Sequence, residues 1–148
     1  MFIVLLALCL GTLANWVSPR RLPWTQDWTT RVRDAVISAG LNVVDLETVT
    51  KMVSRGGGFI LDARPFAAYG EGHLPGAFSL PASTVEESFP DIEPMLTPDT
   101  QILVYCSGEE CEDSMDLGTF LLQQGFTNVS VFVGGYAEWS KAHPGGTP

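Results

Sequence analysis

The chain has 148 residues, 45% of them hydrophobic, which is enough apolar material for one domain with a single core. Its formal net charge of -9 argues against nucleic acid or an anionic membrane surface as the main partner. Three cysteines (Cys9, Cys106 and Cys111) are too few and too unevenly placed for a disulfide framework, and with two histidines they form no zinc-binding pattern. We therefore predict no metal and no cofactor.

The first 17 residues are apolar and carry no charged side chain, which indicates a membrane anchor or a signal segment. We favour an uncleaved anchor, because no basic residue precedes the apolar stretch and the cleavage pattern is poor. Four arginines follow the stretch (Arg20, Arg21, Arg31 and Arg33), so the positive-inside rule places the next domain in the cytoplasm. A secreted or periplasmic location is the alternative.

The remainder divides into three parts. We predict a juxtamembrane linker over residues 18–40 with a short amphipathic helix at 27–39, one domain over 41–143, and a tail at 144–148.

Within the domain, short apolar runs alternate with segments of helical periodicity. The predicted strands cover residues 42–44, 59–61, 77–80, 102–105 and 129–133. The predicted helices cover residues 46–54, 65–69, 113–124 and 136–142, with short helical pieces between 83 and 98 that are interrupted by Pro90, Pro94 and Pro98. This alternation favours an α/β domain whose mainly parallel sheet is covered by helices on both faces.

Cys106 occupies a position that favours sulfur chemistry. It directly follows the apolar run 102–105, and Ser107-Gly108 then turn the chain into a loop that opens the next helix. Backbone N–H groups in such a loop and the positive end of a helix both favour a thiolate over a thiol. Sites of open parallel sheets form at the carboxyl ends of strands, which is where Cys106 is expected to lie.

Three separated stretches together resemble the rhodanese domain family. They are D-A-R at 62–64 followed by G-H-L-P-G-A at 72–77, V-Y-C at 104–106, and G-G-Y-A-E-W at 134–139. Their order and separation match the family pattern over residues 41–143. The resemblance implies a rhodanese-like fold and a sulfurtransferase activity.

Residue by residue, the resemblance implies that Cys106 accepts sulfur and cycles between thiolate and persulfide. It implies a structural ion pair between Asp62 and Arg64, a turn in which His73 packs and hydrogen-bonds, and a core position for Trp139. The active-site loop that it implies comprises Ser107, Gly108, Glu109, Glu110 and Glu112, with Cys111 among them.

The loop departs from the family pattern because it carries four carboxylates (Glu109, Glu110, Glu112 and Asp113) and no Arg or Lys. A dianionic donor would meet like charge without a guanidinium partner, so we expect poor turnover of thiosulfate and no phosphatase or arsenate reductase activity. The alternative is that the acids of the first helical turn face solvent and only offset the helix dipole.

Cys111 stands five residues after Cys106, close enough for the two thiols to reach disulfide range. It would then act as a resolving thiol that attacks a persulfide on Cys106, or form a redox disulfide with it. The alternative is that Cys111 only fills space as a small apolar residue.

The leading hypothesis is a membrane-anchored sulfurtransferase or persulfide carrier that takes sulfur from a small persulfide, a polysulfide or a persulfide-bearing protein. Two other hypotheses remain, a thiol redox protein or sensor that uses Cys106 and Cys111, and a non-catalytic binding module tethered at the membrane.

Overall fold

The structure, a computed structural model, describes residues 2–17, 28–108 and 111–144. Helix α1 (Phe2–Val17) is the first described element, and residues 18–27 of the predicted linker and 145–148 of the predicted tail fall outside the described residues. Among the helices of those three ranges, none combines the length and the apolar character needed to cross a membrane. The anchor expected at residues 1–17 remains a prediction.

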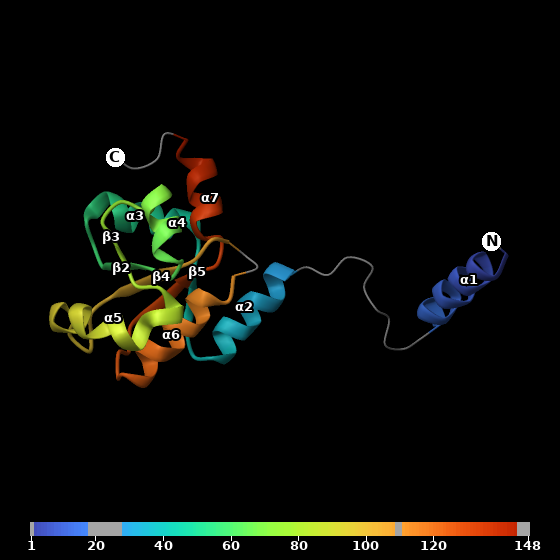
Figure 1. Cartoon of the computed structure of the whole chain (residues 1–148), viewed down its shortest axis with the longest axis horizontal. Helices are drawn as coiled ribbons and strands as arrows, with labels where there is room; N and C mark the ends of the chain where they lie inside the picture. Colours follow the sequence, from blue (N-terminus) through green and yellow to red (C-terminus); the bar gives the residue numbers. More distant parts are fainter. Residues whose placement is uncertain (1, 18–27, 109–110, 145–148) are drawn as a thin grey trace.

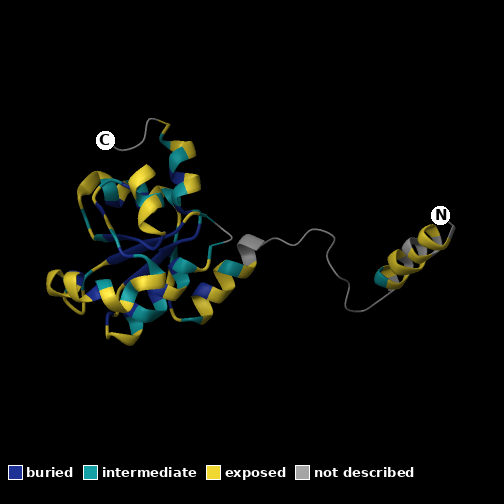
Figure 2. Cartoon of the chain, viewed as in Figure 1, coloured by how far each residue is buried: buried dark blue, intermediate teal, exposed yellow. Residues whose placement is uncertain are grey.

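The centre of the domain is a five-stranded sheet in which every neighbouring pair is parallel (Figure 1). In spatial order its strands are β1 (Asn42–Val44), β5 (Val129–Phe132), β4 (Ile102–Tyr105), β2 (Phe59–Asp62) and β3 (Ala77–Ser79). All residues of β4 and β5 are buried, and Figure 2 shows them as the dark centre of the domain. The prediction of a mainly parallel sheet is confirmed.

Helices cover both faces of this sheet, because each face collects its own group of apolar side chains. On one face lie α2 (Trp28–Ser38), α5 (Val85–Ile92) and α6 (Asp113–Gln123), and on the other lie α3 (Leu46–Arg55), α4 (Phe66–Glu71) and α7 (Gly135–Ala142) (Figure 1). Val36 of α2 is fully buried in the same core as Leu61 and Val104, so α2 is part of the layer that covers the sheet.

Local sequence signals account for the ends of α3. The Asp45 carboxylate accepts a hydrogen bond from the Thr48 N–H at 2.9 Å, which satisfies one free amide of the first turn. Gly56 closes the helix in the left-handed conformation, with φ of 61°.

The prediction that Pro90 interrupts the helical segment is wrong. Helix α5 continues through Pro90, between the short 3₁₀ turns η1 (Ala82–Thr84) and η2 (Glu93–Met95). The N–H that Pro90 lacks would have bonded the carbonyl of Glu86, in the first turn of α5, so the helix loses a single hydrogen bond. Burial of Phe89 and Ile92 against the core stabilises the segment.

Candidate functional site

Cys106 lies at the carboxyl end of β4, the middle strand of the sheet, and only 1% of its surface is exposed. Strands β2 and β5 flank β4 on either side, so the backbone that leads into Cys106 is paired along both edges. The rigid end of a buried strand therefore fixes where this sulfur sits, as the sequence predicted.

The start of α7 holds the loop that follows Cys106. The Tyr136 N–H donates to the Cys106 carbonyl at 2.8 Å, and the Ala137 N–H donates to the Ser107 carbonyl at 2.9 Å. Gly135 makes this approach possible, because its φ is 57° and a Cβ there would collide with the Cys106 carbonyl oxygen. The G-G-Y stretch thus serves as a backbone support for the loop.

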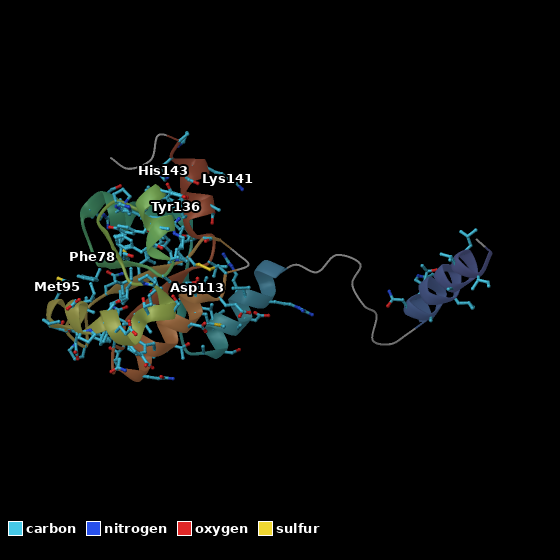
Figure 3. All side chains as sticks on the ribbon, viewed as in Figure 1. Phe78, Met95, Asp113, Tyr136, Lys141 and His143 are labelled. Carbon is cyan, nitrogen blue, oxygen red and sulfur yellow. A yellow bond between two sulfur atoms is a disulfide. The ribbon has the colours of Figure 1, made fainter. Side chains whose placement is uncertain are left out.

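Cys106 and Cys111 form a disulfide, drawn as a yellow bond in Figure 3, with their Cα atoms 6.1 Å apart. The Cys111 N–H donates to the Gly108 carbonyl at 3.0 Å, which turns the chain back towards β4. The expected proximity of the two sulfurs is confirmed, and the resolving role of Cys111 remains a prediction. Cys111 is half-buried, so it is the more accessible sulfur of the pair.

Asp113, the first residue of α6, contacts both sulfurs. Its Oδ2 lies 3.6 Å from the Cys106 Sγ and 3.5 Å from the Cys111 Sγ. A disulfide sulfur carries no proton, so in this state the carboxylate contacts the pair without a hydrogen bond. The Ser107 Oγ lies 3.9 Å from the Cys106 Sγ.

The other acids of the loop are placed differently. Glu112 is exposed, as is Asp116 one turn further along α6. Glu109 and Glu110 lie outside the described residues. The solvent-facing interpretation of the first helical turn therefore holds for Glu112 and fails for Asp113.

The sulfurs of Cys106 and Cys111 and a carboxylate oxygen of Asp113 lie within 4.8 Å of one another, which brings together three potential metal-ligand atoms. The thiolate is the form of cysteine that binds metals, and here the two sulfurs are bonded to each other. In this state the group is a disulfide beside a carboxylate and offers no thiolate ligand.

The D-A-R motif forms a buried ion pair beneath the loop. The Arg64 Nη2 lies 2.6 Å from the Asp62 Oδ2, and the Arg64 Nε lies 2.9 Å from the Asp62 Oδ1. Burial opposes the charge of Arg64, but the hydrogen bonds and the charge of Asp62 outweigh it and raise the pKa of the guanidinium above its usual range. The predicted structural pairing of Asp62 and Arg64 is present.

Tyr105 completes this network from the neighbouring strand. The register of β2 and β4 places Tyr105 beside Asp62, and its hydroxyl donates to the Asp62 Oδ2 at 2.6 Å. The same hydroxyl accepts from the Leu74 N–H at 3.1 Å. Burial, with the Asp62 carboxylate second, raises the pKa of Tyr105 well above its ordinary value, so the phenol stays protonated.

Arg64 also links the network to the support of the loop. Its guanidinium lies 4.3 Å from the centre of the Tyr136 ring, and its Nη2 donates to the Gly72 carbonyl at 2.6 Å. The Tyr136 N–H donates a hydrogen bond to the Cys106 carbonyl. The ion pair is therefore connected to Cys106 through two contacts, from Arg64 to the Tyr136 ring and from the Tyr136 N–H to the Cys106 backbone.

His73 and Trp139 have the structural placements that the resemblance implied. The His73 ring stacks on Tyr69 with 3.9 Å between ring centres, and its Nδ1 lies 3.1 Å from the Tyr69 carbonyl oxygen. Trp139 is 4% exposed and packs in the core on the α7 face. The described side-chain contacts of the two sulfurs come from Ser107 and Asp113.

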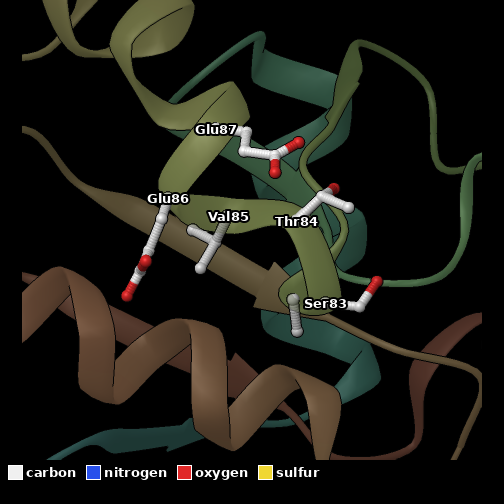
Figure 4. Close-up of a pocket in the computed structure, with 6 residues that line it drawn as sticks. Ser83, Thr84, Val85, Glu86 and Glu87 are labelled. Atoms are coloured by element: carbon white, nitrogen blue, oxygen red, sulfur yellow. The ribbon is translucent and has the colours of Figure 1, made fainter.

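An open hollow of about 230 Å³ lies where η1 meets α5 (Figure 4). Residues 82–87 line it, and the described polar contacts of the two sulfurs come from Ser107 and Asp113 instead.

Sequence reasoning missed three side chains of this site. The sequence counts Asp113 among the loop carboxylates, with the helix dipole as its alternative role, but does not predict its contact with both sulfurs, for which its position two residues after Cys111 is a usable signal. The sequence indicates Tyr105 only as a strand former, although a phenol in a fully buried strand needs a hydrogen-bond partner. Tyr136 carried no signal of its own, because its contact with Arg64 arises only in the folded chain.

Comparison with known proteins places these features in a family. The model of the Rhodanese-like domain matches residues 45–142. The tRNA uridine(34) hydroxylase of Photorhabdus laumondii is 30% identical over an alignment of 133 positions, and the match covers 80% of this chain and 37% of that enzyme. The chain thus spans just over a third of the length of this curated relative.

Two solved structures share the fold. The Rhodanese-like domain of the Anabaena sp. Alr3790 protein is 26% identical with a TM-score of 0.58, and the match covers 68% of this chain and 74% of that one. A variant of EanB, solved with ergothioneine covalently linked with a cysteine persulfide, is 25% identical with a TM-score of 0.59 and is matched over 68% of this chain and 26% of its own. Since the family model covers most of the chain, the protein belongs to the Rhodanese-like domain family.

Proposed function

We propose that the protein is a sulfurtransferase or persulfide carrier in which Cys106 accepts sulfane sulfur. The observation that carries the proposal is the cysteine at the end of the central strand, on a loop supported by α7. Family membership supports it, as does the cysteine persulfide of the related EanB structure. In the first step the Cys106 thiolate attacks the terminal sulfur of a protonated persulfide R–S–SH, so that Cys106–S–SH forms and R–S⁻ leaves with its electron pair.

The disulfide supports a second step, in which Cys111 resolves the persulfide. The Cys111 thiolate attacks the Sγ of the protonated persulfide Cys106–S–SH, the sulfur–sulfur bond of that persulfide breaks, and hydrosulfide leaves with its electron pair. An external dithiol then returns the enzyme to the reduced state and is itself oxidised to a disulfide. It attacks Cys111, the more accessible sulfur, and releases the Cys106 thiolate.

The donor is a small persulfide or polysulfide, or a persulfide-bearing protein, and thiosulfate is a poor donor. Residues 106–116 contain no Lys or Arg, and the described part of this segment places the Asp113 carboxylate against the nucleophile. A dianion would approach Cys106 without a positively charged partner from the loop. The tRNA chemistry named for the Photorhabdus enzyme is not part of this proposal, because the chain covers 37% of that enzyme and has a net charge of -9.

The disulfide also favours a second candidate, a thiol redox protein or sensor in which Cys106 and Cys111 cycle between dithiol and disulfide. In that case a disulfide substrate is reduced or an oxidant is consumed, and no sulfur atom is transferred.

Intact-mass spectrometry separates the two candidates. The reduced full chain is incubated with a polysulfide or with thiosulfate, and the modified cysteine is located by peptide mapping. For sulfur transfer we expect Cys111→Ser to gain the mass of one sulfur at Cys106, Cys106→Ser to gain none there, and wild type to release hydrosulfide as its disulfide forms. If wild type loses two hydrogens while Cys111→Ser never gains sulfur, the redox function is correct.

A further inference from the structure

We propose that Asp113 is the residue that selects sulfur donors by charge, and that it slows the reaction of Cys106 with anionic donors. This inference rests on the proposed function, because it concerns the donor of the same thiol.

The geometry singles out Asp113 from the acids around it. Its Oδ2 lies 3.6 Å from the Cys106 Sγ, whereas Glu112 and Asp116, on either side of it in the sequence, are exposed. Asp113 itself is half-buried, so its charge is less screened than those of its exposed neighbours. The carboxylate therefore lies where a donor must arrive.

Several titratable groups lie on the elements that pack against α6. Strands β4 and β5 and the turn η1 bring Tyr105 and, directly after β4, Cys106. Helix α5, whose Phe89 ring contacts Phe120 of α6, carries Glu86, Glu87 and Asp91, and α2, on the same face of the sheet, carries Arg31, Arg33 and Asp34. Among the described contacts of the two sulfurs, the charged side chain is that of Asp113. The Tyr105 hydroxyl is bonded to Asp62 and to the Leu74 N–H, so it belongs to the network beneath the loop.

The reaction brings donor charge close to this carboxylate. The attacked sulfur must come within bonding distance of the Cys106 Sγ, so a charge on a small donor lies about 6 Å from the Asp113 oxygen. At an effective dielectric between those of a protein surface and bulk water, two like charges at about that separation change a rate about tenfold. The same carboxylate should raise the reaction rate of a cationic reagent by a similar factor.

Methanethiosulfonates of different charge test the proposal with one reaction. The probes are the 2-sulfonatoethyl (anionic), methyl (neutral) and 2-trimethylammonioethyl (cationic) reagents, each of which forms a mixed disulfide with a thiolate and releases a sulfinate. The reference protein is the reduced full chain with Cys111→Ser, in which modification of Cys106 is followed by peptide mapping.

Asp113→Asn is made in this background, and Asp116→Asn, an exposed acid on the same helix, is the matched control. We expect Asp113→Asn to lower the ratio of the cationic to the anionic rate by about a hundredfold at low salt, and by less at high salt. Asp116→Asn should lower the ratio by less than about threefold.

Two results would overturn the proposal. One is an unchanged ratio in Asp113→Asn. The other is an equal acceleration of all three reagents, since the carboxylate would then act only on the population of the Cys106 thiolate. A parallel incubation with thiosulfate and with polysulfide keeps the two proposals apart. Absence of a Cys106 persulfide with both donors counts against the proposed function, whereas the thiosulfonate ratio decides the role of Asp113.

Discussion

The hydroxyl of Tyr105 provides the sharpest test of the network beneath the loop. Tyr105→Phe removes one fully buried oxygen atom and changes nothing else in the shape of the side chain. The lost bond to the Asp62 carboxylate, 2.6 Å long, is worth about 1.5–3 kcal/mol because its acceptor is charged. The Leu74 N–H, 3.1 Å from the same oxygen, is left without this acceptor in the interior, at a further cost of about 1–3 kcal/mol.

We therefore expect Tyr105→Phe to lower the free energy of unfolding by about 4 kcal/mol, out of the ~5–15 kcal/mol typical of a domain of this size. The assay is urea denaturation of the full chain at pH 7, with the disulfide kept oxidised in every sample. Tyr69→Phe is the control, because the Tyr69 hydroxyl makes a single bond, 2.7 Å long, to the uncharged Ala77 carbonyl and should contribute about 1 kcal/mol. If Tyr105→Phe and Tyr69→Phe lower the free energy of unfolding by amounts that agree within about 1 kcal/mol, the reasoning is refuted.

The same hydroxyl predicts an alkaline pH dependence. The pKa of Tyr105 is raised in the folded protein from its ordinary value of 10.0, so its contribution is complete below pH 10.0 and is lost as the pH rises further, when only the unfolded chain ionises. The stability difference between wild type and Tyr105→Phe should shrink above that pH by up to about 1.4 kcal/mol per pH unit. A constant difference up to pH 11 would contradict the raised pKa.

Three further predictions concern single residues. Gly135→Ala should lower the free energy of unfolding by more than about 2 kcal/mol and slow sulfur acceptance at Cys106, because the new methyl group displaces the loop. Equal rates of sulfur acceptance in wild type and Gly135→Ala, measured by intact-mass spectrometry, would contradict this. Arg64→Ala should destabilise the protein by about 3–5 kcal/mol in urea, because a buried carboxylate loses its partner. Asp45→Ala should lower the melting temperature at pH 7, and the effect should fade as the pH falls below 3.8, because the bond from Thr48 lowers the pKa of Asp45 and its contribution is lost on protonation.

The elements of this fold could be predicted because their signals are local. A four-residue apolar run is enough to predict the strand Ile102–Tyr105, and an acid before a periodic segment is enough to predict the N-cap at Asp45. The interruption expected at Pro90 does not occur because the local rule neglects tertiary packing. Pro90 lies inside α5, where its missing amide costs one hydrogen bond, and burial of Phe89 and Ile92 compensates for it.

The site could be predicted only in part, because half of it depends on which strands are neighbours. Cys106 and Cys111 are close in sequence, so their proximity was predictable. The contact between Asp62 and Tyr105 spans 43 residues and follows from the pairing of β2 with β4, which no local pattern encodes. Asp113 falls between these cases, because only the direction of the first turn of α6 decides whether it faces the sulfurs or the solvent.

Of the three motifs, D-A-R and G-G-Y-A-E-W support the loop, and V-Y-C carries the reactive cysteine. The ion pair of Asp62 and Arg64 is almost completely inaccessible, with side-chain exposures of 0% and 5%, so no donor reaches it. Its route to the reaction is through Tyr136, whose ring contacts Arg64 and whose N–H holds the Cys106 carbonyl. Substitutions in the pair should therefore move the thiol and change the reaction rates with all donors by a similar factor. Substitution of Asp113 should instead change the order of these rates among donors of different charge. A donor series measured on both kinds of variant distinguishes positioning from selection.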